Sequence, residues 1–344
     1  SRRRHTRYGT VTGVQTCALP ISKMYYSKSS ASLFLLPLSA IFFLISLIRK
    51  YLYRFNFLKS FKFKVPVVIV GNITLGGTGK TPLIIHLAKE LKKNGYYPGV
   101  ISRGYGSSVK GVIEVNQKSN VDEVGDEPIL IQKHIRMPVF VSKDRVMAAK
   151  ALMRKYKRIN VILSDDGLQH YRLMRDIEVL VIDGTREFGN GYLFPAGPLR
   201  ELKHKLNDVD AIVCNHKKVI EHSYLMKYKS KFLVNLKTKQ KIPLTKVHLR
   251  NIHAIAGIGN PNRFFNDLKS FGLEFDSSSY QDHYRFSKKD FKTLSGKNII
   301  MTEKDAMKCE KFAQDNFWYL PVDADIDLKF TNVILKKLKY ISHG

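Results

Sequence analysis

The stretch "VIVGNITLGGTGKTPLIIHLAKEL", residues 68–91, decides the fold of this chain. Hydrophobic residues run into a glycine-rich turn, and an apolar pattern with helical spacing follows Lys80 and Thr81. Glycines allow backbone N–H groups to close around phosphate oxygens at the N-terminus of a helix. The stretch therefore predicts a buried strand, a phosphate-binding loop and a helix, in that order.

Two side chains of this loop have a predicted chemical task. Lys80 would reach the β- and γ-phosphates of a bound nucleotide, and the Thr81 hydroxyl would bind Mg²⁺. The loop departs from the usual G-x-x-x-x-G-K-[ST] pattern because Thr74 replaces the first glycine. A plain glycine turn before a surface lysine is the alternative, but the flanking strand and helix favour a nucleotide site. We expect the nucleotide to contact Gly76, Gly77, Thr78, Gly79, Lys80 and Thr81.

A pair of adjacent carboxylates follows a second hydrophobic strand, in "INVILSDDGLQH" at residues 159–170. A phosphate-binding loop needs an acidic group for its metal ion, and Asp165 and Asp166 supply it. Ligands of open α/β sheets bind at the carboxyl ends of the strands, where this pair lies. Neighbouring side chains leave a strand on opposite faces, so the pattern does not decide which of the two binds the metal. An ordinary strand-ending turn is the alternative.

Short apolar runs alternate with helical patterns from residue 65 onward. Strands are predicted at 67–70, 161–163, 179–182 and 211–213, and helices at 83–91 and 145–153. This alternation predicts an α/β fold, a P-loop NTPase-type parallel sheet with helices on both faces. The predicted domains are a P-loop core at 65–215, a lysine-rich linker at 216–250 and a smaller C-terminal α/β domain at 251–344.

The N-terminal region contains no Asp or Glu before Glu90. Within it, the 18 residues at 31–48 carry no charge, which is about the minimum for a membrane span. Basic and aromatic residues alternate directly after them. We therefore predict a membrane-associated helix and its basic flank at 23–64, with the C-terminal side of the helix in the cytoplasm. A buried core helix and a helix lying in the membrane interface remain alternatives.

The first 22 residues show neither a helical nor a strand period and do not resemble a signal peptide. Met24 is a plausible start, and residues 1–22 are predicted to be a non-native leader.

Composition limits the class of partner. The 344-residue chain has a formal net charge of +29, which implies nucleic acid, an anionic membrane surface or a phosphorylated substrate. The 3 cysteines form no CxxC pair, which argues against a disulfide scaffold or a cysteine zinc site and fits a reducing compartment.

Eight motifs distinguish among P-loop proteins because they occur together and in one order. They are "LLPLSAIFFLISLIRKYLYR", "VGNITLGGTGKTP", "ISRGYG", "GDEP", "SDDGLQH", "FPAGPLRE", "QDHYRF" and "TEKDAMK". Together they resemble the tetraacyldisaccharide 4'-kinase family of the lipid A pathway. That family phosphorylates the 4'-hydroxyl of a tetraacylated glucosamine disaccharide 1-phosphate. The resemblance covers residues 33–330, nearly the whole chain after the leader.

The resemblance implies roles for residues that local patterns leave open. Asp126 matches the family's catalytic base, His283 the histidine that tunes it, and Lys80 the phosphate-binding lysine. The family often has a second histidine after the first, where this chain has Tyr284. The implied metal residues are Thr81, Asp165, Asp166, Gln169 and Glu201. The implied substrate residues are Arg103, Tyr105 and Arg200.

The same resemblance implies ATP and Mg²⁺ as cofactors and an acylated disaccharide 1-phosphate lipid as substrate. It places the protein on the anionic inner-membrane surface, at the cytoplasmic face in a Gram-negative bacterium, with no nucleic acid and no obligate protein partner. A partner-switching P-loop ATPase without a lipid acceptor is the alternative, but Leu75 and Gly76 stand where such proteins often have an extra lysine. A nucleic-acid-binding protein is suggested by charge alone, and no known motif supports it.

Overall fold

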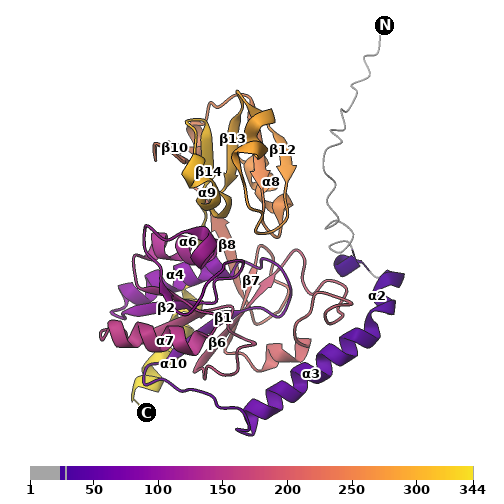
Figure 1. Ribbon diagram of the computed structural model, residues 1–344, viewed down its shortest axis with the longest axis vertical. Helices are drawn as coiled ribbons and strands as arrows, with labels where there is room; N and C mark the ends of the chain where they lie inside the picture. Colours follow the sequence, from indigo (N-terminus) through magenta and orange to yellow (C-terminus); the bar gives the residue numbers. More distant parts are fainter. Residues whose placement is uncertain (1–23, 28, 344) are drawn as a thin grey trace.

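The computed structural model describes residues 24–27 and 29–343, so the predicted leader lies outside the described residues. Two α/β domains are stacked on one another, and a pair of N-terminal helices lies along the larger domain (Figure 1). The predicted fold class is confirmed.

The larger domain is built on a nine-stranded sheet with the order β15-β8-β7-β6-β1-β5-β2-β4-β3. All neighbouring strands are parallel except at the two edges, where β15 and β3 run antiparallel. The strands are β1 (Val67–Gly71), β2 (Pro98–Ser102), β3 (Ile113–Glu114), β4 (Val139–Val141), β5 (Val161–Asp165), β6 (Ile177–Asp183), β7 (Ala211–Asn215), β8 (Tyr224–Lys229) and β15 (Asp323–Ile326).

Helices cover both faces of this sheet because its central strands are apolar on both sides. Three helices share a core with one face: α4 (Lys80–Lys93), α6 (Asp126–Ile135) and α10 (Leu328–His343). The other face is covered by α7 (Arg145–Lys155) and by long loops, and the short helix α5 (Val121–Val124) precedes α6. In the sheet register, Val70 of β1 pairs with Asp165 of β5, so the phosphate loop and the acidic pair emerge side by side.

The C-terminal domain contains a six-stranded sheet with the order β10-β9-β14-β13-β11-β12. Its strands are β9 (Phe232–Asn235), β10 (Lys241–Pro243), β11 (Ile252–Ala256), β12 (Asp276–Ser279), β13 (Asn298–Thr302) and β14 (Phe317–Leu320). The helix α8 (Pro261–Ser270) packs on one face of this sheet and α9 (Glu303–Cys309) on the other. Four short 3-10 helices lie among the described residues: η1 (Lys203–Asn207), η2 (Leu244–Lys246), η3 (Lys288–Leu294) and η4 (Glu310–Phe312).

The domain boundaries of the structure differ from those expected. The supposed linker at 216–250 contains β8, β9 and β10, and the chain then returns to the larger domain through β15 and α10. The strand β8 lies near the sheet edge, and its side chains are only partly buried. Met226 is buried, while Lys227 and Lys229 face solvent. A half-exposed strand lacks the continuous apolar run of the fully buried central strands, so the sequence pattern did not identify it as a strand.

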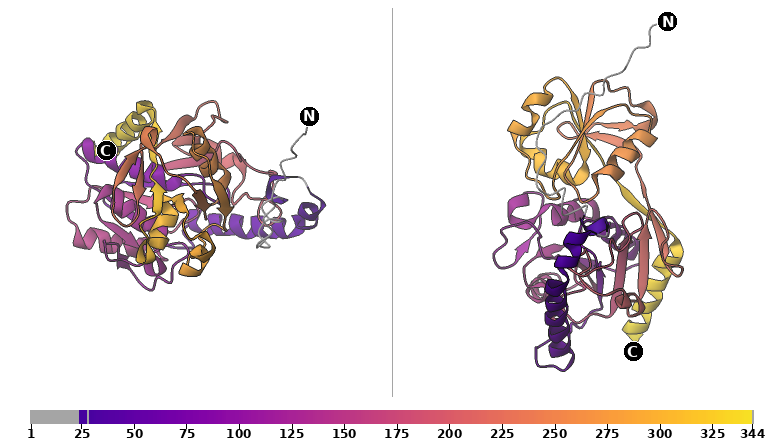
Figure 2. Two further views of the ribbon diagram at one scale, coloured as in Figure 1. Left: turned by 90° about the horizontal axis from the view of Figure 1, so that it is seen from above. Right: turned by 90° about the vertical axis from the view of Figure 1, so that its right-hand side faces the viewer.

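Two helices precede the larger domain: α2 (Ser30–Phe34) and α3 (Leu36–Arg54). Figure 2 shows α3 running along the outside of that domain. It has the length and composition needed to cross a membrane, and few of its residues are buried in the protein. The exposed apolar side chains of the two helices include Leu33, Phe34, Leu38, Ile41, Leu44, Ile45 and Ile48. The alternative of a buried core helix is therefore wrong.

Candidate active site

The phosphate loop is shaped by an asparagine that follows β1. Asn72 Nδ2 donates to the Thr74 carbonyl at 2.7 Å and lies 3.4 Å from that of Gly76. Thr74, which replaces the usual first glycine, forms a bridge with Leu199 instead of making a sharp turn. The helix α4 begins directly after Gly79, whose φ of 94° suits a glycine. The predicted strand, loop and helix are therefore present, and the departure at Thr74 has a structural partner.

Lys80 stands in the first turn of α4 and faces the acidic pair. Its Nζ lies 3.2 Å from Asn72 Oδ1 and 3.5 Å from Asp166 Oδ1. Arg200 Nη1 donates to the other oxygen of Asp166 at 3.0 Å. Burial alone would raise the pKa of the Asp166 carboxyl, but Lys80 and Arg200 hold that pKa well below its ordinary value. Asp166 is therefore an anion between the cations Lys80 and Arg200, beside the loop that is expected to bind the phosphates.

Asp165 has a different environment from its neighbour. Ser102 Oγ donates to Asp165 Oδ2 at 3.1 Å, while Oδ1 is buried without a hydrogen-bond partner among the described residues. Burial, with a contribution from Glu127, raises the pKa of Asp165 to about 7. The buried Arg145 fixes the turn by donating to the carbonyls of Asp165, at 2.9 and 3.2 Å, and of Asp166, at 2.6 Å. Asp165 therefore presents a desolvated oxygen that a cation would satisfy.

The residues present fit a magnesium ion. Mg²⁺ prefers carboxylate oxygens and takes most of its remaining ligands from water and phosphate, so one or two side chains are enough. Oδ1 of Asp166, like that of Asp165, is buried and has no hydrogen-bond partner within the described part of the chain. Gln169 and Glu201 are paired with each other at 2.7 Å, and Gln169 also donates to the Asn72 carbonyl at 3.2 Å. No group of three or more His, Cys, Asp or Glu residues suited to a metal occurs among the residues that the structure describes.

The motif "FPAGPLRE" joins the N-terminal helices to the phosphate loop. At one end, Ser39 of α3 donates to the Leu193 carbonyl at 2.8 Å and accepts from the Ala196 amide at 3.0 Å. At the other end, the Arg200 amide donates to the Ile73 carbonyl at 2.7 Å, so this segment pairs with the start of the loop. One stretch of chain thus holds α3 against the larger domain and carries Arg200 and Glu201 into the site.

A second cluster lies where α6 meets the C-terminal domain. Asp126, the first residue of α6, is only 3% exposed, and its Oδ1 accepts from the Glu127 amide at 2.9 Å. His283 Nδ1 lies 3.2 Å from Asp126 Oδ2, and the positive φ of His283, 61°, is unusual for a residue other than glycine. Asp126 and His283 come from different domains. The predicted pair therefore forms only across the domain interface.

Two lysines of "TEKDAMK" complete this cluster from α9. Lys304 Nζ lies 3.9 Å and Lys308 Nζ 3.6 Å from Asp126 Oδ2. Burial favours the neutral acid, but Lys304, His283 and Lys308 outweigh it and hold the pKa of Asp126 well below its ordinary range. For His283, burial lowers the pKa, and the bond to Asp126 raises it above the ordinary value overall. Asp126 is therefore ionised at neutral pH.

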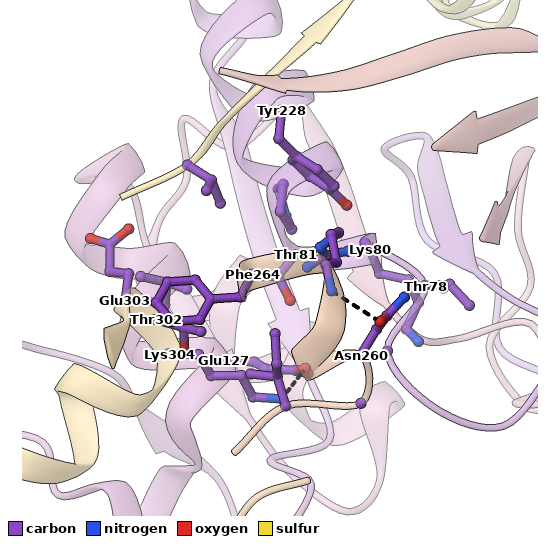
Figure 3. Close-up of a pocket in the computed structure, with 18 of the residues that line it drawn as sticks. Thr78, Lys80, Thr81, Glu127, Tyr228, Asn260, Phe264, Thr302, Glu303 and Lys304 are labelled. Carbon is purple, nitrogen blue, oxygen red and sulfur yellow. Dashed lines mark hydrogen bonds and ion pairs between the residues drawn. The ribbon is translucent and has the colours of Figure 1, made fainter. Parts of the chain in front are cut away.

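A cavity lies between the two domains and is closed on one side by the phosphate loop (Figure 3). Glu127 and Lys304 lie together in it and form an ion pair of 3.1 Å across the interface. Tyr228, Phe264 and other apolar residues form a less polar part of the wall. Glu127 also contributes to the raised pKa of Asp165, so the start of α6 acts electrostatically on the acidic pair.

Comparison with known proteins decides which P-loop family has this site. The family model described as Tetraacyldisaccharide-1-P 4'-kinase matches residues 31–339. The chain belongs to this kinase family. It is 43% identical over 319 residues to the tetraacyldisaccharide 4'-kinase of Methylobacillus flagellatus, covering 92% of this chain and 95% of that protein. It is 44% identical over 320 residues to the enzyme of the same name from Shewanella denitrificans, covering 92% and 96%.

A solved structure of the kinase family agrees with this assignment. It is described as the "apo" form of LpxK from Aquifex aeolicus in complex with ATP, and it superposes with a TM-score of 0.75. The two sequences are 30% identical, and the match covers 90% of this chain and 99% of that one. The resemblance inferred from the motifs is confirmed, whereas the role of each site residue stays a prediction.

The structure adds residues that the sequence did not assign. Glu127 lies within "GDEP" and Lys304 and Lys308 within "TEKDAMK", so the motifs contained them without indicating a task. Arg186 donates to the Asp183 carboxylate at 2.8 Å, to the Gly259 carbonyl at 3.0 Å and to that of Gly77, which links the loop to the C-terminal domain. No sequence signal points to Arg186. Of the predicted substrate residues, Arg103 and Tyr105 are exposed, and the Tyr105 ring lies 5.0 Å from that of His283.

Gly79→Ala is expected to abolish ATP binding. A Cβ here would collide with the Tyr228 hydroxyl and lie 2.9 Å from Asn215 Nδ2, so the loop must shift. Gly95→Ala is the matched control, because Gly95 has a similar φ of 82° and nothing within 4 Å of its Cβ position. Both variants carry about 1–3 kcal/mol of backbone strain, and only the first disturbs the loop. Calorimetric titration with ATP that gave equal affinities for the two would contradict the loop assignment.

Proposed function

We propose that the chain transfers the γ-phosphoryl group of ATP to the 4'-hydroxyl of a tetraacylated disaccharide 1-phosphate, a step of lipid A biosynthesis. One observation carries the proposal. Lys304 lines the same interdomain cavity as the phosphate loop and pairs there with Glu127 at 3.1 Å, while its Nζ lies 3.9 Å from Oδ2 of Asp126, which lines a second cavity. A site that combines phosphate binding with a desolvated, ionised carboxylate suits transfer to a hydroxyl group.

The P-loop side of the cavity would bind and orient the nucleotide. Backbone N–H groups of residues 77–81 and the Lys80 ammonium face the phosphates, and the apolar wall that includes Tyr228 and Phe264 suits a purine base. Asp165, Asp166 and Thr81 would hold Mg²⁺, which would neutralise charge that develops on the phosphates. Arg200 keeps Asp166 ionised in that position.

The second cavity, which Asp126 and His283 line, would handle the proton of the acceptor. An alcohol is a weak nucleophile and must lose its proton as the new P–O bond forms. Asp126 is ionised and can accept that proton, although the surrounding cations make it a weak base. A weak base is sufficient where the transition state is loose, because the proton then leaves late. His283 orients the carboxylate and, by its charge state, sets its basicity.

The exposed apolar helices would hold the enzyme at the inner membrane, with the kinase domains on the cytoplasmic face. The exposed side chains of α3 include Leu44, Ile45 and Ile48, and basic and aromatic residues follow them. The acyl chains of the substrate lie in the same membrane, and "FPAGPLRE" connects α3 to the phosphate loop. Excess positive charge favours anionic lipid headgroups and the anionic acceptor.

Transfer of γ-labelled phosphate from ATP to the disaccharide 1-phosphate in detergent micelles tests the proposed function. The kinase requires the lipid for ATP turnover and places the label on the 4'-oxygen. ATP turnover that is independent of the lipid, with release of free phosphate, would favour the partner-switching ATPase, which the comparisons do not support.

Leu44→Glu combined with Ile45→Glu is expected to release the protein from anionic vesicles. These side chains are 55% and 61% exposed, so the change removes membrane contact without disturbing the core. We expect the fraction bound in vesicle flotation to fall by about 10-fold or more, since each apolar side chain contributes about 1.5–3 kcal/mol when buried. The control is Met147→Glu with Leu328→Glu, which adds the same charge at sites 48% and 67% exposed. Equal release of both variants would show a charge effect alone.

A further inference from the structure

We propose that Lys304 is a positioning residue that holds His283 in the one tautomer able to donate a hydrogen bond to Asp126. The kinetic consequence of this inference rests on the proposed function, whereas the tautomer itself does not. Nothing in the family match or in the sequence motifs gives Lys304 this task.

His283 lies between the carboxylate of Asp126 and the ammonium group of Lys304. Its Nδ1 lies 3.2 Å from Asp126 Oδ2, which belongs to α6 of the larger domain. Its Nε2 lies 3.2 Å from Lys304 Nζ, which belongs to α9 of the C-terminal domain. The two ring nitrogens thus have partners of opposite charge.

The chemistry of the two partners determines where the ring proton lies. An ammonium group has three N–H donors and no lone pair, so Lys304 can only donate to Nε2. Nε2 must then carry the lone pair, and a neutral imidazole has its single proton on the other nitrogen. That nitrogen is Nδ1, which faces a carboxylate that can only accept. The Nε2–H tautomer would put two donors against each other at Lys304 and two acceptors against each other at Asp126.

Lys304 is itself held charged and in place. Its side chain is 16% exposed and pairs with Glu127 Oε1 at 3.1 Å and Asp282 Oδ1 at 3.5 Å. Burial would lower the pKa of the lysine, but Glu127, Asp126 and Asp282 raise it above its ordinary value. It stands in the first turn of α9, where the Thr302 side chain caps the helix by accepting from the Asp305 amide. Lys304 therefore stays protonated and can donate to His283, and the capped helix α9 fixes the position of its backbone.

The charged groups that face His283 act in opposite directions. Asp126 from α6 favours the imidazolium, as does Asp282 from the same loop as His283, with Oδ1 3.8 Å from Nε2. Lys304 from α9 disfavours it, and the Tyr105 ring covers the remaining side at 5.0 Å. Removing the ammonium would expose Nε2 to Asp282 alone. A second proton would then bind more readily, and Asp126 would face an imidazolium that reduces its basicity.

The first experiment measures the tautomer in the unaltered protein. The full chain in detergent micelles is labelled with ¹⁵N-histidine, and His283→Asn identifies the His283 signals among the 11 histidines. At the alkaline end of a pH titration we expect the Nδ1–H tautomer, with Nε2 showing the shift of an unprotonated nitrogen. The Nε2–H tautomer would overturn the proposal without any variant at position 304.

The second experiment changes the charge. Lys304→Met is expected to raise the pKa of His283 by about one unit, because a like charge in contact with the ring has been removed. Lys304→Arg should retain most of the wild-type pKa and tautomer. Lys237→Met is the control, since it removes a charge from an exposed ion pair with Asp315 on the same domain. A folded Lys304→Met protein with unchanged His283 shifts would overturn the proposal, and so would an equal shift in Lys237→Met.

The kinetic readout separates this inference from the proposed function. If transfer occurs, the acidic limb of the kcat/KM profile should move to higher pH by the same one unit in Lys304→Met. Lost activity in Lys304→Met with an unaltered His283 would assign Lys304 to nucleotide binding and overturn the positioning role. A wild-type protein that shows the Nδ1–H tautomer without any transfer would refute the proposed function and leave the tautomer standing.

Discussion

Replacing Lys80 with alanine is expected to lower phosphoryl transfer by about 10³-fold or more, a loss comparable to removing other cations that stabilise the transferring group. Lys80 opens α4 at the phosphate loop, and its ammonium lies 3.5 Å from Asp166. In the transition state negative charge spreads over the γ-phosphoryl oxygens and the leaving group, so this cation acts where charge develops. Single-turnover transfer with labelled ATP measures the loss.

Loss of Lys80 leaves the rest of the site largely paired. Asp166 keeps Arg200 at 3.0 Å, so the carboxylate is not left without a cation. Lys89→Ala is a matched control on the same helix, because Lys89 pairs with Asp323 at an exposed position. We expect Lys89→Ala to retain transfer and Lys80→Ala to retain the wild-type melting temperature within a few degrees. Near-normal turnover by Lys80→Ala would exclude the P-loop assignment.

The phosphate site could be predicted from sequence because each of its parts is local. A glycine-rich turn between a buried strand and an amphipathic helix defines one arm, and a strand that ends in Asp165 and Asp166 defines the other. Strand pairing then brings the arms together, with Val70 opposite Asp165. The different states of the two carboxyls could not be predicted, because they depend on burial and on Arg200 and Glu127, which are distant in sequence.

The interdomain cluster could be predicted only from family motifs. Asp126 and His283 stand 157 positions apart in the sequence, and neither periodicity nor spacing relates them. Lys304 and Lys308 reach them from a third segment, α9, through packing between domains. The domain boundaries were missed for a related reason. The strand β15 completes the first sheet after the second domain has ended, and only pairing with β8 shows this.

For the apolar helix α3 the sequence says less about its surroundings than about its length. Its apolar length is visible in the sequence, but the same pattern also fits a buried helix. Exposure decides between them, since Ile41 and Ile45 of α3 are 55% and 61% exposed. The polar residue Ser39 marks the face that contacts the domain, through Leu193 and Ala196. Sequence thus gives the length of the helix, and the structure gives the direction in which its apolar face points.

Asp126→Asn is expected to lower kcat by about 10²–10⁴-fold, the usual contribution of a general base. The KM for ATP should change little, because the carboxylate does not contact the phosphate loop and asparagine keeps its shape. Stability should also be nearly retained. The two lysines that face Asp126 keep other anions, Lys304 with Glu127 at 3.1 Å and Lys308 with Asp305 at 2.8 Å.

His283→Ala is expected to cost less than Asp126→Asn, because the histidine acts through the carboxylate and Asp126 remains ionised beside Lys304 and Lys308. The double variant should be less impaired than the product of the two single losses, since two groups that act as one unit are not additive. A purely structural role for Asp126 requires a different result, in which melting temperature and ATP affinity fall in parallel with kcat. Measuring all three quantities in the four proteins of the cycle separates the two cases. Fully independent effects would exclude a joint action of Asp126 and His283, because a histidine that only orients and tunes its neighbour has nothing to act on once the carboxylate is gone.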